Sequence, residues 1–195
     1  MKKSTTRVTI IILIGIIGIV SYYTYLSNRS KEEQQEATLS AVQLVLSKDL
    51  EKDYPPTPRE VIKYYNEILD CFYNEEATKE EIEDLGNKAR ELYDDELVAN
   101  NELGTYQMAL RSEVEDFKKN NRKILRFAPA SSINVEEFTE DGYSFARILC
   151  GYTITEDGVN FSSDQVYLLR KDANKRWKIY GWKPSSEVNP EQKEQ

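Results

Sequence analysis

The sequence predicts an α+β domain that follows an N-terminal membrane-spanning helix. Residues 8–26 form an apolar run without a charged side chain. Three amphipathic helical patterns with capping signals at their starts lie between residues 57 and 121. From Arg122 the apolar period shortens from 3.6 residues towards 2, which is typical of strands. Helices followed by consecutive antiparallel strands define the α+β class.

Residues 8–26 are expected to cross a bilayer once, as an uncleaved signal-anchor helix. A helix of this length spans roughly 28 Å, close to the ~30 Å hydrocarbon core. Tyr22, Tyr23 and Tyr25 lie at one end, where aromatic rings favour the headgroup layer. A cleavable signal peptide and a buried soluble helix are the alternatives. No A-x-A-like cleavage site follows the apolar run, which argues against the signal peptide.

The charges around this span predict its orientation. Lys2, Lys3 and Arg7 precede the span, and Arg29 and Lys31 follow it, so residues 1–7 are expected in the cytoplasm. Every acidic residue lies after residue 31, and the chain has 34 acidic against 26 basic residues. An acidic extracytoplasmic body repels nucleic-acid phosphates, so we expect no nucleic-acid partner. The expected partners are the lipid bilayer of the cell membrane and another envelope protein.

Residues 27–55 are expected to form a juxtamembrane amphipathic helix and linker. One apolar face recurs at helical spacing through Leu39, Val42, Val45, Leu46 and Leu50. Packing of this face on the following domain is the favoured interpretation, and a short coiled-coil stalk is the alternative. The prolines of Tyr54-Pro55-Pro56 end the segment, because proline cannot continue a helix.

The domain itself is expected over residues 56–183. Thr57-Pro58-Arg59-Glu60 and Thr78-Lys79-Glu80-Glu81 are typical of capping boxes that begin two helices, the second with an apolar stripe extending to Leu92 and Tyr93. A third helix follows Asn100-Asn101. An antiparallel meander is then expected, with strands over 124–135, 143–155, 159–170 and 176–183, and turns at 140–142, 156–158 and 171–174. Residues 184–195 are polar and are expected to form a disordered tail.

The last strands read V-Y-L-L-R-K-D-A-N-K-R-W-K-I-Y-G-W, in which Trp177-Lys178-Ile179 resembles the closing strand of the nuclear transport factor 2-like (cystatin-like) superfamily. The chain is also similar to an uncharacterised family of Gram-positive bacterial membrane proteins. That similarity covers the N-terminal anchor, the segment from Lys48 to Val61, Asn100-Asn101 and the terminal strands. The resemblance implies a curved antiparallel sheet wrapped around helices as a cone with an open mouth. It implies no known activity.

Enzymes of the cone superfamily, such as ketosteroid isomerase-like proteins, place Asp, Tyr or His side chains in the mouth. This chain has no histidine, so such chemistry would need Asp and Tyr. The candidates for lining the pocket are Tyr65, Tyr106, Tyr152, Asp164 and Tyr167. Because the chain has 13 tyrosines, aromatic side chains that line a core or an unreactive cleft are the favoured interpretation.

Two further residue types invite a structural interpretation. Cys71 and Cys150 are expected to be buried free thiols, with a single disulfide between helix and sheet as the alternative in an extracytoplasmic domain. Trp177 and Trp182 have opposite parity in the last strand, so they should face opposite sides of the sheet. Trp177 with Ile179 would then lie in the core, and Trp182 with Tyr180 on an exposed face.

No catalytic or metal-binding motif is visible. The sequence lacks histidine, C-x-x-C spacing, a glycine-rich phosphate loop and a G-x-S-x-G elbow, so we expect no metal, no cofactor and no enzyme activity. Our first hypothesis is a non-catalytic extracytoplasmic binding or assembly domain. The alternative is a small-molecule binder, or a ketosteroid isomerase-like enzyme, that uses the cone pocket. An open pocket would favour this alternative, and a pocket filled by its own side chains would exclude it.

Overall fold

The computed structural model describes residues 39–188 of the chain. The chain divides into two compact units, Met1–Ser40 and Ala41–Gln195. The predicted membrane span at 8–26, the N-terminal residues 1–7 and residues 27–38 of the juxtamembrane segment lie outside the described residues. Within 39–188, the helices are too short or too polar to cross a membrane. The second unit begins at Ala41, and the predicted domain start at residue 56 lies within it.

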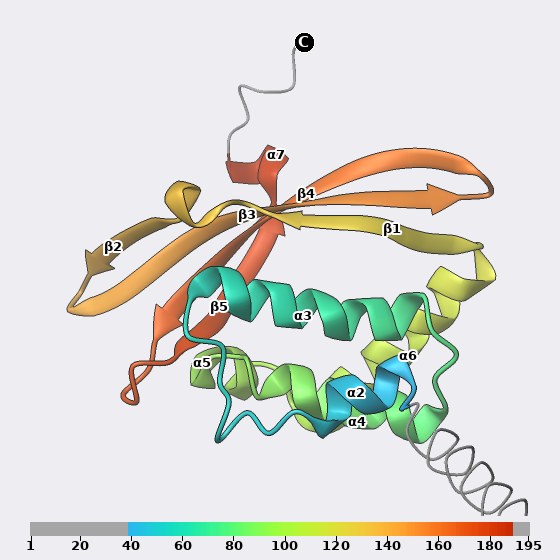
Figure 1. Ribbon diagram of the computed structural model, residues 1–195, viewed down its shortest axis with the longest axis horizontal. Helices are drawn as coiled ribbons and strands as arrows, with labels where there is room; N and C mark the ends of the chain where they lie inside the picture. The colour runs from blue at the N-terminus through green and yellow to red at the C-terminus, as the bar shows by residue number, and fades with distance from the viewer. Residues whose placement is uncertain (1–38, 189–195) are drawn as a thin grey trace, which may run out of the picture. The chain divides into compact units, whose positions relative to one another are not determined.

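The α+β class is confirmed, because the helices come first and form a layer on one face of a curved antiparallel sheet (Figure 1). The helices are α2 (Ala41–Ser47), α3 (Pro58–Tyr73), α4 (Lys79–Arg90), α5 (Asp95–Ala99) and α6 (Leu103–Lys119). The strands are β1 (Arg122–Pro129), β2 (Glu136–Glu140), β3 (Tyr143–Glu156), β4 (Val159–Lys171) and β5 (Trp177–Pro184). The main core lies between the two layers.

Both predicted capping signals begin helices, although only the second forms a complete capping box. At Thr78 the hydroxyl accepts from the Glu81 amide at 3.1 Å, and the Glu81 carboxylate accepts from the Thr78 amide at 2.9 Å. At Thr57 the hydroxyl accepts from the Glu60 amide at 3.2 Å but donates to the Glu60 carboxylate at 2.9 Å. The return bond to the cap amide is therefore missing from the first box.

The amphipathic face of α2 packs on the rest of the domain, which confirms the favoured interpretation of this segment for residues 41–47. Val42 and Leu50 are buried. The Tyr64 hydroxyl donates to the Val45 carbonyl at 2.7 Å, and the Lys88 ammonium donates to the Lys48 carbonyl at 3.0 Å. The helix ends well before the prolines, because Asp49 accepts hydrogen bonds from the next amides and turns the chain.

The sheet order is β1-β3-β4-β5, and β2 pairs with the same edge of β3 as β1 does. The predicted strand over 124–135 is wrong: β1 ends at Pro129, the short helix η1 (Ser132–Asn134) follows, and β2 begins at Glu136. One more bond to β3 follows Pro129, since the Ala130 amide donates to the Leu149 carbonyl at 2.8 Å, and η1 then separates β1 from β2. The long strand β3 pairs with β2 through its first half and with β1 through its second half.

The turns around β3 are as predicted. Asp141 and Gly142 have φ values of 49° and 81°, and Asp157 and Gly158 have values of 48° and 82°. Two successive positive φ angles at Asp-Gly define a type I′ turn, whose twist matches that of the strands it joins. After β5, Ser185–Val188 form the short helix α7 beside β4 and β5 (Figure 1). The predicted disordered tail is therefore wrong for these residues, and residues 189–195 lie outside the described part.

Helix α4 ends at Arg90, so the predicted extension of its stripe through Leu92 and Tyr93 is wrong. These residues instead run beside β5. The Ile179 amide donates to the Leu92 carbonyl at 2.8 Å, and the Asp94 amide donates to the Ile179 carbonyl at 2.8 Å. A single bridge between Tyr93 and Ile179 thus covers the edge of β5 at this point, and the backbone amide and carbonyl of Ile179 are satisfied.

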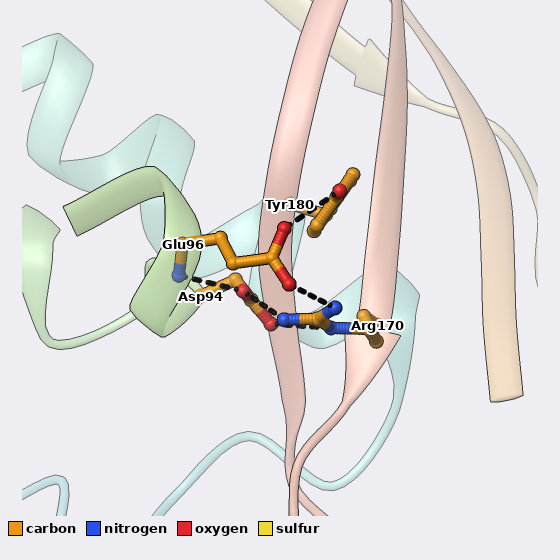
Figure 2. A network of polar contacts seen from close by, with 4 residues as sticks. All are labelled: Asp94, Glu96, Arg170 and Tyr180. Carbon is orange, nitrogen blue, oxygen red and sulfur yellow. Dashed lines mark hydrogen bonds and ion pairs between the residues drawn. The ribbon is translucent and has the colours of Figure 1, made fainter. Parts of the chain in front are cut away.

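A polar network fastens the unpredicted helix α5 to the sheet (Figure 2). The Arg170 guanidinium on β4 donates to both carboxylate oxygens of Asp94, at 2.9 and 2.5 Å, and to Glu96 at 2.7 Å. The Tyr180 hydroxyl on β5 donates to the second Glu96 oxygen at 2.9 Å. Asp94 also caps α5, since its carboxylate accepts from the Glu96 amide at 3.0 Å.

Candidate ligand-binding cavity

A cavity of about 530 Å³ lies between the helices and the sheet. Helices α3, α5 and α6 form one wall, and the inner faces of β1, β3, β4 and β5 form the other. Nine of the twenty lining residues are aromatic, and the polar side chains among the others are those of Asn101, Glu113, Ser163 and Gln165. The aromatic members of the lining are Tyr65, Phe72, Tyr73, Tyr93, Tyr106, Phe117, Tyr152, Tyr167 and Trp182.

The four tyrosines singled out from the sequence, Tyr65, Tyr106, Tyr152 and Tyr167, all line this cavity. Asp164 is not among the lining residues. Its neighbours Ser163 and Gln165 line the cavity, and successive side chains of a strand point to opposite faces. Asp164 is exposed on the outer face of β4.

Trp182 also lines the cavity, against the prediction from strand parity. The pairing of β4 with β5 shifts register between Leu168 and Leu169, which pair with Gly181 and Ile179. Tyr180 is the extra residue of this β-bulge, so the parity of β5 reverses after it. Trp182 therefore shares a face with its partner Tyr167, and its ring centroid lies 6.1 Å from that of Tyr167. Trp177 lies in the core, 4% exposed.

A buried hydroxyl network lies at the inner end of the cavity. The Tyr152 hydroxyl donates to the Asn66 side-chain oxygen at 2.7 Å, and it lies 2.7 Å from the Tyr167 hydroxyl. Since Tyr152 has one hydroxyl proton, Tyr167 is the donor to Tyr152. The Asn66 amide nitrogen donates to the Ile62 carbonyl at 2.8 Å, which fixes the orientation of the amide group. Asn66 is fully buried.

Asn66 was not singled out from the sequence. A signal was present, because Asn66 lies four residues after Ile62 and therefore on the apolar stripe of α3. A polar residue on a buried stripe needs a partner in the tertiary structure. Its partner Tyr152 is distant in sequence, so the pairing itself could not be read from the pattern.

The buried phenols of the cavity are protonated at neutral pH. Burial raises the pKa of Tyr65, Tyr93, Tyr152 and Tyr167 above the ordinary tyrosine value. The Tyr65 and Tyr93 hydroxyls lie 3.2 Å apart and form a second pair. Neutral phenols donate and accept hydrogen bonds, whereas a general base must be deprotonated.

The outer rim of the cavity carries a carboxylate. The Tyr73 hydroxyl on α3 donates to Glu113 on α6 at 2.7 Å, and the Tyr73 ring lies 4.3 Å from the Phe117 ring, centroid to centroid. Among the described residues that line the cavity, Glu113 is the one charged side chain. The sequence pattern did not indicate Glu113, because an acidic residue on an amphipathic helix is usually a solvated one.

The two cysteines lie in the core and not in the cavity lining. Both are free and buried, which agrees with the favoured interpretation of the sequence. Burial raises the pKa of the Cys71 thiol to about 11. The Cys150 sulfur accepts from the Asn66 amide nitrogen at 3.4 Å. A buried thiol with a raised pKa keeps its proton and is therefore a poor nucleophile.

The fold and the cavity define the class of this protein: an α+β domain with an aromatic cavity between its helices and its curved sheet. The chain belongs to the family described as "Domain of unknown function (DUF6715)", which matches residues 1–182. This confirms the resemblance to an uncharacterised family. A comparison with curated proteins finds no match.

Proposed function

We propose that this domain binds a small, largely apolar molecule in its cavity, without catalysis. The observation that carries the proposal is the cavity of about 530 Å³, lined by aromatic rings and by a few phenol hydroxyls at its inner end. Small-molecule sites are typically concave, mostly apolar and roughly 300–1,000 Å³ in volume, with a few placed polar groups. An open cavity favours the hypothesis of a small-molecule binder over that of a domain that serves only in assembly.

The chemistry of the lining supports binding over catalysis. The buried tyrosines keep their protons, and Asp164, the predicted carboxylate, points away from the cavity. Glu113 lies at the rim, while the Tyr152 and Asn66 pair lies at the inner end. The lining therefore provides shape, aromatic contact and hydrogen bonds, but no adjacent acid and base.

The setting of this domain is part of the proposal. We infer that residues 8–26 anchor the chain in the cell membrane, with the N-terminus in the cytoplasm and the domain outside. We also infer a nuclear transport factor 2-like fold, since a curved sheet over helices with an open cavity agrees with the cone that the resemblance implies. Gram-positive origin and an envelope partner remain predictions of the same resemblance.

A titration with a neutral aromatic probe tests the proposal. We suggest 3-tert-butylphenol, measured by isothermal calorimetry on the full chain in a zwitterionic detergent. Ser163→Phe places a ring in the cavity, because Ser163 lines it. Ser162→Phe is the matched control, since Ser162 is exposed and its neighbour on the same strand faces inward.

The expected result is saturable binding to the unchanged chain and to the Ser162→Phe variant, and its loss in the Ser163→Phe variant. Partition of the phenol into detergent is the same for all three chains, so the difference between the variants reports the cavity. Equal binding to both variants, or no saturable binding to any chain, would contradict the proposal.

A further inference from the structure

We propose that the cavity selects organic cations over neutral molecules of the same shape, and that Glu113 provides the selecting charge. This inference rests on the proposed function, because it names the class of ligand that the cavity would take. The ligand class is an ammonium group, tertiary or quaternary, attached to an apolar ring. Two features of the lining favour it: the charge at the rim and the aromatic rings around that charge.

The carboxylate of Glu113 has a hydrogen-bond donor but no ion-pair partner among residues 39–188. Its contact is the Tyr73 hydroxyl at 2.7 Å. The nearby bases of the helical layer are engaged elsewhere. Arg111 pairs with Glu83, Lys118 donates to the Glu75 carbonyl at 2.9 Å, and Arg90 donates to the Asn101 carbonyl at 2.7 Å. The negative charge at the rim is therefore left for a ligand to compensate.

The position of Glu113 directs it to the cavity. Tyr106, Leu110, Glu113 and Phe117 recur at three- and four-residue intervals along α6, so they share one face of that helix. All of them line the cavity. A ligand that enters between α6 and the sheet therefore meets the carboxylate and the aromatic rings together.

Aromatic rings favour a cation over a neutral group of equal size. The face of a tyrosine or phenylalanine ring carries negative electrostatic potential, which attracts ammonium and guanidinium groups. The domain already uses this attraction nearby, because the Arg90 guanidinium lies 5.2 Å from the centre of the Tyr106 ring. Arg90 is not part of the lining, whereas Tyr73, Tyr106 and Phe117 are.

The same features of the lining disfavour a negatively charged ligand. The lining contains no lysine or arginine within the described residues, so an anion would find no counter-charge there. An anion would also face Glu113 directly. A neutral apolar molecule would bind through shape and burial but would gain nothing from the carboxylate.

Two isosteric probes isolate the charge. 3-Hydroxyphenyltrimethylammonium and 3-tert-butylphenol have the same shape, and differ by a positive charge. Each is titrated by calorimetry into the full chain in zwitterionic detergent. Glu113→Gln removes the charge but keeps an oxygen that accepts from Tyr73. Glu115→Gln is the matched control, because Glu115 is an exposed acid of the same helix outside the cavity lining.

We expect the unchanged chain to bind the cation several-fold more tightly than the phenol. Glu113→Gln is expected to weaken cation binding about three- to five-fold, as is typical of a partly exposed charge pair, and to leave phenol binding unchanged. Glu115→Gln should change neither. Raising the salt concentration should weaken binding of the cation alone.

The outcomes separate this inference from the proposed function. If the phenol binds and Ser163→Phe removes that binding, but the cation binds no more tightly, the inference on charge is overturned and the binding function stands. The inference on charge is also overturned if Glu113→Gln and Glu115→Gln weaken cation binding equally. If neither probe saturates the unchanged chain, the proposed function itself fails, and the inference fails with it.

Discussion

Asp94 joins three parts of the domain, and its removal gives a graded prediction. The residue is 3% exposed, accepts two bonds from the Arg170 guanidinium and caps α5 through the Glu96 amide. Asp94→Ala removes the cap and leaves a guanidinium, 14% exposed as a side chain, with Glu96 as its remaining carboxylate. Asp94→Asn keeps an oxygen for the cap, but it removes the charge and replaces one of the two oxygens that accept from Arg170 with an amide nitrogen.

The magnitude follows from these contacts. Loss of an N-cap costs about 1 kcal/mol. Removing one partner of a buried pair costs about 3–5 kcal/mol when the other charge is left alone. Since Glu96 continues to hold Arg170, the guanidinium is not left alone, and we expect about 2 kcal/mol for the lost pair, below that range, and about 3 kcal/mol in total for Asp94→Ala. Asp94→Asn should cost about 2 kcal/mol, because the cap survives.

Thermal unfolding of the full chain, followed by near-UV circular dichroism, measures this series. For a chain of this size 1 kcal/mol lowers Tm by about 2–4 °C, so Asp94→Ala should lower Tm by about 6–12 °C and Asp94→Asn by about 4–8 °C. Glu96→Gln is the control, with a smaller fall because Glu96 is exposed. If Glu96→Gln lowers Tm as much as Asp94→Ala does, the assignment of the stabilisation to Asp94 is refuted. A double mutant cycle with Arg170→Met should also show coupling between the two sites.

Three further predictions concern the cavity, the pH dependence and a helix start. Asn66→Ala leaves the Tyr152 hydroxyl without its acceptor, so the free energy of unfolding should fall by about 2–4 kcal/mol, and urea unfolding that shows a loss under about 1 kcal/mol would contradict the network. The buried phenols have a higher pKa in the folded state than in the unfolded state, so they stabilise the fold fully below about pH 10 and lose that contribution as the pH rises beyond it. Absorbance at 295 nm should therefore show a group of tyrosines that ionise only together with unfolding, and complete titration of a folded chain near pH 10 would refute their burial. Thr78→Ala removes the capping box, so the free energy of unfolding, measured by thermal unfolding, should fall by about 1 kcal/mol. Thr139→Ala in the exposed strand β2 is the control, and it should leave the helix content unchanged.

Much of the site could be anticipated from local patterns, and its exceptions have specific causes. Tyr65, Tyr106, Tyr152 and Tyr167 were candidates because a cone mouth without histidine would need Tyr and Asp, and all four line the cavity. Asp164 lies outside the lining, because its strand neighbours Ser163 and Gln165 face inward. Tyr73 and Glu113 meet only through the packing of α3 against α6, which leaves no mark in either segment alone.

The sequence by itself determined the α+β class, two helix starts and the turns on either side of β3. Helix starts at Thr57 and Thr78 and the Asp-Gly turns depend on hydrogen bonds and backbone angles among residues close in the chain, so their signals are local. Tertiary structure alone decided the face of Trp182, because a bulge against β4 reversed its parity. It also divided the edge of β3 between β1 and β2, and set the segment before α5 beside β5. Those outcomes depend on register and packing between distant segments, which is also why the cavity exists only in the folded chain.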